Sequence, residues 1–160
     1  EWDTLIPNFW KPVLEDVEKK IHEPKNLEGI QEWRIYLIPH NCLPRKVLDI
    51  GCGVTQPYRP ILQNLGEYVG IDLKEGKDIT VCDCHHLPYG DKEFGFVWMS
   101  EVLEHLDNPE QAVAEAKRVG EHGVILFSTP LNSFFKMDAS HKVVNMPYTT
   151  VATGDGMIAW

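Results

Sequence analysis

The fold is most tightly constrained by an apolar segment, residues 46–50, that runs directly into the turn Gly51-Cys52-Gly53. A short apolar run that ends in glycines is typical of a buried strand entering a tight turn. Four further strands are predicted, at residues 68–73, 79–82, 93–99 and 124–127. Buried strands of this kind occur in sheets that are covered on both faces, so helices are expected between them.

Two helical patterns lie between these strands. Residues 57–65 carry Pro57 in the first turn and are followed by Gly66, as helix ends favour. The other helix is predicted to begin after the N-cap Asn108 and to stop at Gly120. The alternation of strands and helices predicts an α/β fold with a mostly parallel central sheet. In such sheets ligands bind at the carboxyl ends of the strands, where the strand order reverses.

The two ends of the chain lie outside this alternation. Apolar residues at helical spacing predict helices over 11–22 and 28–38. Near the other end, the segments 149–152 and 157–160 flank the turn residues Gly154-Asp155-Gly156, which predicts an antiparallel hairpin.

Charge and composition exclude several classes of protein. Fifteen lysines and arginines against 24 aspartates and glutamates give a net charge of −9, the wrong sign for general nucleic-acid binding. No apolar run approaches the ~20 residues that span a bilayer, and no signal-peptide pattern is visible. The four cysteines, at positions 42, 52, 82 and 84, follow no disulfide-scaffold spacing. The sequence therefore predicts a reduced, cytoplasmic protein without a membrane segment.

Two kinds of nucleoside cofactor use a glycine turn of this type, dinucleotides and S-adenosylmethionine. They carry opposite charges, so the charged residues near the turn distinguish between them. A dinucleotide site requires a third glycine at position 56, which is Gln56 here, and Asp49 would repel a pyrophosphate. S-adenosylmethionine carries a positive sulfonium and no phosphate, so acidic residues near the strand ends favour it. Acids occur in or beside these loops at Asp49, Asp72, Asp83, Glu101 and Glu104. Asp72 ends a strand, where a carboxylate can accept two hydrogen bonds from a ribose diol.

Four segments, in this order, resemble the class I S-adenosylmethionine-dependent methyltransferases, and among them the broad small-molecule group. They are Leu48-Asp49-Ile50-Gly51-Cys52-Gly53, Gly70-Ile71-Asp72-Leu73, Cys82-Asp83-Cys84-His85-His86-Leu87-Pro88-Tyr89 and Ser100-Glu101-Val102-Leu103-Glu104-His105-Leu106. The resemblance implies a Rossmann-like sheet and S-adenosylmethionine as cofactor, with S-adenosylhomocysteine as product.

The resemblance implies specific contacts to the methionine part of the cofactor. Gly51 and Gly53 would line it, and Asp49 would hold its amino group through water. Met99 and Ser100 end a strand whose backbone meets the ammonium group in the family.

Contacts to the adenosine part are implied in the same way. Asp72 would bind the ribose hydroxyls and Leu73 would pack on adenine. Asp83 would accept from the adenine amino group, and the backbone N–H of Cys84 would donate to a ring nitrogen.

The expected reaction is methyl transfer to a small-molecule or glycan-like acceptor. A neutral nucleophile must lose a proton, and His105 is the candidate base, with His141 and Tyr148 as weaker candidates. A nucleic-acid substrate is disfavoured, because the segment Ser100–His105 lacks the Asn-Pro-Pro-Tyr type of sequence that grips an exocyclic amine.

One domain of residues 1–160 is expected, divided by role. Residues 1–40 would form a helical lid, 46–129 the cofactor-binding core and 130–160 a short substrate region. Because only 30 residues follow Pro130, a partner subunit could complete the substrate cap.

Two alternative functions remain at this point. A methyltransferase-like chain could act as a binding or scaffold module without turnover of its own. A nicotinamide-dependent oxidoreductase is disfavoured by Gln56 and Asp49. The side chains of Cys82, Cys84, His85 and His86 are of the types that bind soft metal ions. Their span is too short for the usual zinc spacing, so no metal is expected.

Overall fold

The computed structural model describes residues 8–13, 15, 37, 46–128, 142, 144–151 and 155–160. Residues 11–13 and 15 are helical, as predicted, and follow a 3-10 turn, η2 (Asn8–Trp10). The rest of the helix predicted at 11–22, nearly all of the one at 28–38, and His141 lie outside the described residues.

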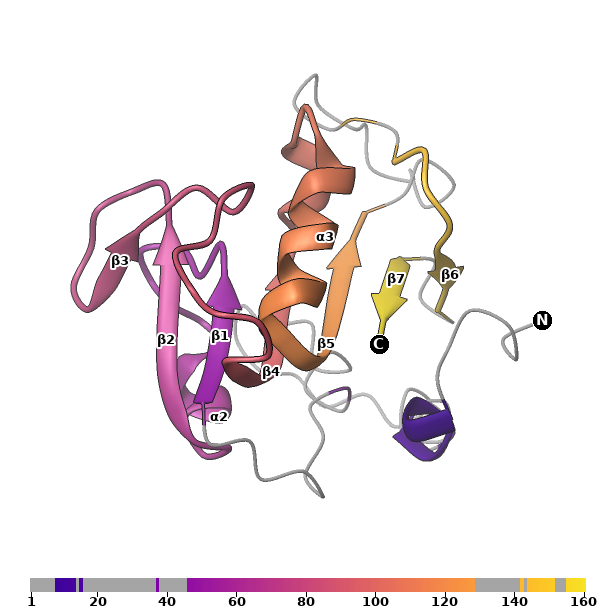
Figure 1. The fold of residues 1–160 in the computed structure, drawn as a ribbon, viewed down its shortest axis with the longest axis horizontal. Coiled ribbons are helices and arrows are strands. Elements are labelled where there is room, and N and C mark those ends of the chain that lie inside the picture. The colour runs from indigo at the N-terminus through magenta and orange to yellow at the C-terminus, as the bar shows by residue number, and fades with distance from the viewer. Residues whose placement is uncertain are drawn as a thin grey trace.

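The described strands form one seven-stranded sheet in the order β3-β2-β1-β4-β5-β7-β6 (Figure 1). Its members are β1 (Lys46–Ile50), β2 (Glu67–Asp72), β3 (Ile79–Val81), β4 (Phe94–Ser100), β5 (Gly120–Phe127), β6 (Thr149–Thr150) and β7 (Gly156–Ala159). The first five strands pair in parallel, whereas β7 pairs antiparallel with both β5 and β6. The predicted α/β sheet with an antiparallel end is therefore confirmed.

The strand order reverses at β1. The chain passes from β1 to β2 on one side and later returns to β4 on the other side. Such a switch point leaves a crevice beyond the carboxyl ends of the two central strands. The glycine turn Gly51-Cys52-Gly53 follows β1 and therefore lies at this point.

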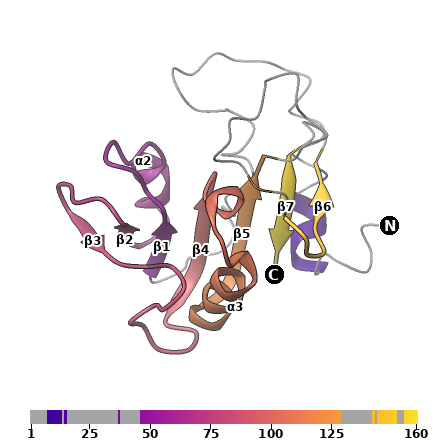
Figure 2. The same cartoon turned by 90° about the horizontal axis from the view of Figure 1, so that it is seen from above.

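The two helices α2 (Arg59–Leu62) and α3 (Pro109–Val119) cover opposite faces of the sheet (Figure 2). Neighbouring residues of a strand point to opposite faces, so Leu48 and Val47 of β1 belong to different core clusters. The α3 side contains Leu48 and Ile50, and the other side contains Val47, Trp98 and Leu62 of α2.

Helix α3 has the ends that the sequence predicts. The side chain of Asn108 accepts a hydrogen bond from the backbone N–H of Gln111 at 3.3 Å, and Gly120 is the C-cap. The buried residues of the helix are Ala112, Val113, Ala116 and Val119. Small side chains on this face allow the helix to pack closely on the sheet.

Arg118, near the end of α3, fixes the loop that follows β3. Its guanidinium donates to the carbonyls of Tyr89 at 2.7 Å and Leu87 at 3.0 Å, and it forms an ion pair with Glu115. Glu115 in turn accepts from the backbone N–H of Leu87 at 2.7 Å. The Arg118 guanidinium lowers the pKa of Glu115 to about 2. The loop is thus held by charge-assisted hydrogen bonds on its helix side.

Two elements have a boundary that differs from the sequence prediction by more than two residues. The helix predicted at 57–65 is regular only over Arg59–Leu62, because Asn64 and Leu65 donate to the carbonyls three residues before them, as in a 3-10 turn. The strand predicted at 124–127 begins at Gly120, where it pairs with Phe94. The first half of this strand was not predicted because Glu121 and His122 are polar and do not continue the apolar run.

Candidate cofactor-binding site

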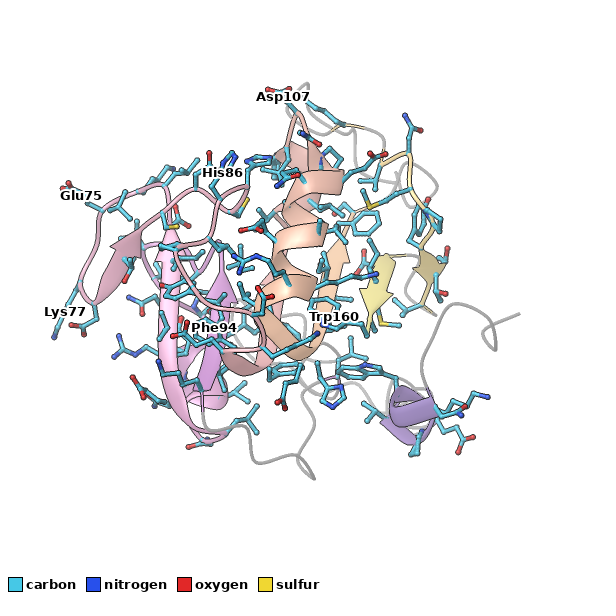
Figure 3. The ribbon with its side chains drawn as sticks, viewed as in Figure 1. Glu75, Lys77, His86, Phe94, Asp107 and Trp160 are labelled. Carbon is cyan, nitrogen blue, oxygen red and sulfur yellow. The ribbon has the colours of Figure 1, made fainter. Side chains whose placement is uncertain are left out.

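A cavity of about 510 Å³ lies at the carboxyl ends of β1, β2 and β4. It is called the main cavity below. In Figure 3, His86 and Asp107, from two loops at this edge, lie at the top, and Phe94 at the start of β4 lies below them. The walls are formed by Ile50, Gly51, Ile71, Asp72, Leu73, Lys74, Cys82, Cys84, Glu101, Val102, His105 and Leu106.

The glycine turn forms the wall of the main cavity next to β1. The backbone N–H groups of Gly51 and Cys52 donate to the carbonyl of Ile71 at 2.8 and 3.0 Å. Gly51 and Gly53 have φ values of +68° and +69°, in the left-handed region that favours glycine. A Cβ at Gly51 would lie 2.2 Å from Cγ2 of Val102, whereas a Cβ at Gly53 would meet no atom within 4 Å. Gly53 therefore leaves open space above the turn.

Replacing Gly51 by Ala is expected to destabilise the protein. The new Cβ would clash with Val102, and the residue would hold a left-handed backbone at a cost of about 1–3 kcal/mol. Denaturant unfolding should show that loss, and the variant should bind S-adenosylhomocysteine more weakly. Gly90→Ala is the control, because its Cβ would make ordinary contact with Glu93. Equal stability of the two variants would contradict the expectation.

Asp72 joins the end of β2 to the glycine turn. One carboxylate oxygen accepts from the backbone N–H of Gly53 at 3.0 Å, and the other accepts from that of Lys74 at 2.9 Å. A carboxylate oxygen has two lone pairs, so each oxygen can accept a second hydrogen bond. Asp72 is only half-buried and lies in the cavity wall, so a diol in the cavity can reach it.

Asp49 lies beneath the turn and outside the cavity wall. It is 2% exposed, and Oδ2 accepts a hydrogen bond from the hydroxyl of Tyr68 at 2.7 Å. Burial raises the pKa of Asp49 to about 7, although the Tyr68 hydrogen bond opposes this shift. Burial and Asp49 also raise the pKa of Tyr68 well above its ordinary value. The nearest partner of Asp49 in the structure is thus a side chain of the neighbouring strand.

The other end of the main cavity carries apolar and sulfur-containing side chains. Leu73 is 71% exposed, which leaves its apolar surface open to a planar ligand. Cys82 and Cys84 line the same end. Asp83 lies between them on the exposed side of the loop and accepts from the backbone and the ring of His85.

Two glutamates lie close together beyond β4. Glu101 lines the main cavity with a left-handed φ of +58° and accepts from the hydroxyl of Ser128 at 2.8 Å. Glu104 is fully buried, and one of its oxygens accepts from the backbone N–H of Ser128 at 3.3 Å. Burial and the neighbouring Glu101 raise the pKa of Glu104 to about 8. Glu104 is therefore mostly protonated at neutral pH.

The buried Glu104 is expected to make stability fall as the pH rises. The unfolded chain releases this proton near pH 4.5 and the folded chain near pH 8. The free energy of unfolding therefore falls as the pH rises between these two values and becomes constant above them. Glu104→Gln should remove that pH-dependent penalty, which is on the order of 4 kcal/mol at pH 8.

Urea unfolding of both proteins at several pH values from 5 to 8 measures this effect. The stability difference between Glu104→Gln and the parent should widen in favour of the variant as the pH rises. The exposed Glu110→Gln is the control and should give a constant difference. A constant difference for Glu104→Gln as well would show that this carboxyl titrates normally.

The structure brings five of the predicted site residues together in the cavity wall: Gly51, Asp72, Leu73, Cys84 and His105. The other five predicted residues, Asp49, Gly53, Asp83, Met99 and Ser100, lie outside the wall. Met99 is fully buried in the core. Sequence reasoning assigned no role to Lys74, Cys82, Val102 and Leu106, which also form the wall. Their positions follow from loop conformation, for which the sequence carries no periodic signal.

The residues of the main cavity fit S-adenosylmethionine. Its volume lies within the ~300–1,000 Å³ usual for small-molecule sites. The left-handed turn with open space at Gly53 allows a ligand to approach the backbone closely. Asp72 and Glu101 give the wall negative charge, which suits a sulfonium and an ammonium group. Gln56 occupies the position of a dinucleotide motif's third glycine, and its side chain donates to the carbonyl of Lys77 at 2.7 Å.

Curated relatives of the chain include two ubiquinone biosynthesis O-methyltransferases. The protein from Azoarcus sp. (strain BH72) is 29% identical over 155 residues, covering 85% of this chain and 63% of the relative. The protein from Bordetella avium (strain 197N) is 30% identical over 147 residues, covering 81% of this chain and 58% of the relative. The chain therefore spans about six tenths of the length of these relatives.

Solved structures of other proteins have the same fold as this chain. The [4+2]-cyclase SpnF superposes with a TM-score of 0.59 at 18% identity, over 84% of this chain and 63% of that chain. A SAM-dependent methyltransferase from Archaeoglobus fulgidus gives a TM-score of 0.55 at 24% identity, over 67% and 56% of the two chains. A family model described as "Methyltransferase domain" matches residues 48–128, just over half of the chain. The chain thus belongs to the methyltransferase domain family and shares the α/β fold of these solved structures.

Proposed function

We propose that the protein transfers the methyl group of S-adenosylmethionine to a hydroxyl oxygen of a small-molecule acceptor. The observation that carries this proposal is the main cavity, in which Asp72 at one end and His105 at another share one wall. The cofactor supplies a methyl group that its sulfonium already activates. The protein's contribution is then to position the two reactants and to remove a proton.

The hydrogen-bonding groups of the turn would position the cofactor. Asp72 would accept from the ribose hydroxyls, and its bonds to the backbone of Gly53 and Lys74 keep the carboxylate oriented for this contact. Leu73 would cover one face of the adenine with its exposed side chain. The methionine end would then lie towards Gly51 and Glu101, in the part of the cavity nearest His105.

A small acceptor is supported by a second cavity beside the first. It has a volume of about 320 Å³ and shares Leu106 with the main cavity. Leu103 and Met146 give it apolar surface, and Lys142 and Asn145 add polar groups. Such a mixed lining is usual for sites that bind small organic molecules. The names of the ubiquinone O-methyltransferase relatives support oxygen as the methylated atom.

The test is a methyl-transfer assay with S-adenosylmethionine labelled in its methyl group. Phenols and catechols should become labelled in a panel that also contains amines, thiols, sugars and oligonucleotides. Mass spectrometry of the product should place the methyl group on oxygen. Labelling confined to amines, sugars or oligonucleotides would refute the proposed acceptor class. Binding of S-adenosylhomocysteine without turnover on any acceptor would instead support the binding or scaffold module.

Several expectations about the whole protein stay predictions. They are the division of residues 1–160 into lid, core and substrate region, a partner subunit that completes the cap, and a cytoplasmic location. Among the described residues, no helix has the length and apolar character needed to cross a membrane.

A further inference from the structure

Three consecutive side chains beside the main cavity have the chemistry of metal ligands. The carboxylate of Asp83, the thiol of Cys84 and the ring of His85 each offer a ligand atom, and these atoms lie within 4.8 Å of one another. Sequence spacing argued against a metal here, because zinc ligands are usually separated by two or more residues. The turn after β3 removes that objection, since it folds Asp83 and His85 onto each other.

Asp83 and His85 are already paired. Oδ1 of Asp83 accepts from the backbone N–H of His85 at 2.9 Å and lies 2.6 Å from Nδ1 of its ring. The other ring nitrogen, Nε2, is buried and has no hydrogen-bond partner among the residues that the structure describes. Nδ1 is the ring nitrogen beside Asp83, so it is the atom that would bind an ion together with that carboxylate.

The segment that carries these ligands is held in place on its far side. The side chain of Gln111 donates to the carbonyl of His85 at 3.3 Å. Arg118 donates to the carbonyl of Leu87 at 3.0 Å, and Glu115 accepts from the backbone N–H of Leu87 at 2.7 Å. The two side chains also form an ion pair with each other at 2.7 Å. Ligands on a braced loop lose little freedom when an ion binds, which favours affinity.

Cys84 connects this group of side chains to the main cavity. Its side chain is buried and lies in the cavity wall, together with that of Cys82. A thiolate, an imidazole and a carboxylate are the ligands of zinc, and a site with three protein ligands keeps a fourth position for water. Here water could reach the fourth position from the cavity.

We propose that Asp83, Cys84 and His85 bind a thiophilic divalent cation such as Zn²⁺, and that this cation and S-adenosylmethionine exclude each other. The exclusion follows from Cys84, which lines the space that the cofactor occupies, and this half of the proposal rests on the cofactor's place in the main cavity. Tetrahedral ligands at zinc lie about 3.3 Å apart, so Asp83 and His85 must separate from their present 2.6 Å. Binding also releases the thiol proton of Cys84, and the ring proton of a neutral His85 moves from Nδ1 to Nε2.

Cobalt(II) is the probe for the site, because a thiolate ligand gives it a strong charge-transfer absorption. Titration of the reduced, folded protein with Co²⁺ should produce this band with a stoichiometry of one, and Zn²⁺ should displace it. Cys84→Ser should abolish the band. His85→Ala removes a direct ligand, so it should weaken Co²⁺ binding by at least the ~10-fold to 100-fold that the loss of an outer-shell partner typically costs.

Two neighbouring substitutions are the controls. Cys52→Ser removes a buried cysteine outside this group, and His86→Ala removes the adjacent exposed histidine, labelled in Figure 3. Both variants should keep the band. Its absence in the parent protein, or its survival in Cys84→Ser, would overturn the metal site.

Competition is measured separately, with S-adenosylhomocysteine and without any acceptor. Saturating S-adenosylhomocysteine should remove the Co²⁺ band, and Zn²⁺ should weaken S-adenosylhomocysteine binding to the parent but not to Cys84→Ser. Simultaneous binding of both ligands would overturn the exclusion. Because no methyl transfer is monitored, failure of the proposed acceptor chemistry leaves these outcomes unchanged.

Discussion

Replacing His105 by Ala is expected to lower methyl-transfer turnover about 10²-fold to 10⁴-fold, the usual contribution of a general base. His105 follows β4 and presents the one imidazole in the wall of the main cavity among the described residues. A neutral hydroxyl is a poor nucleophile until its proton leaves, so the loss should appear in kcat. The affinity for S-adenosylhomocysteine should remain nearly the same, because that ligand donates no proton during the reaction.

Steady-state kinetics and calorimetry on the same preparations distinguish a base from a structural residue. His86→Ala is the matched control, because His86 is exposed and lies outside the cavity wall. Acceptors whose hydroxyl ionises more readily should partly restore the turnover of His105→Ala. A loss of less than about tenfold, below the general-base range, together with no dependence on acceptor acidity, would assign His105 a structural role.

Asp72→Ala is expected to weaken S-adenosylhomocysteine binding about 10-fold to 150-fold, which corresponds to ~1.5–3 kcal/mol. The variant loses the acceptors proposed for the ribose diol. It also loses the bonds to Gly53 and Lys74 that hold the glycine turn beside β2. Isothermal titration calorimetry measures the affinity, and circular dichroism tests whether the fold is retained.

Glu75→Ala controls for charge in the same loop. Glu75 is exposed, and its side chain lies outside the main cavity (Figure 3). The Glu75→Ala variant should therefore bind S-adenosylhomocysteine almost as tightly as the parent protein does. Asp72→Asn keeps one oxygen acceptor, so its affinity should fall between those of the parent and Asp72→Ala. Unchanged affinity in a folded Asp72→Ala would show that the ribose lies elsewhere.

The sheet could be predicted because buried strands leave a strong local pattern. The run at 46–50 is apolar and ends in a glycine turn, and Asn108 and Gly120 mark both ends of α3. Prediction failed where pairing, rather than local pattern, decides the structure. The first half of β5 is polar in sequence, yet it forms a strand because β4 offers hydrogen-bonding partners beside it.

The candidate site could be predicted in part for the same reason. Gly51 and Asp72 directly follow or end strands, so the sheet places them in the cavity wall. Asp49 could not be placed from sequence, because its contact with Tyr68 depends on which strands are neighbours. The pairing of Asp83 with His85 likewise depends on a turn conformation that has no periodic signature.

The antiparallel strand β7 has a consequence for how the chain reaches this structure. It covers the open side of β5, from Val124 to Phe127, with residues that the ribosome adds some 30 positions later. Until then a nascent chain exposes a fully apolar strand edge, which is a template for pairing between molecules. Translation speed and chaperone access over residues 128–155 should therefore influence the soluble yield more than the final stability does.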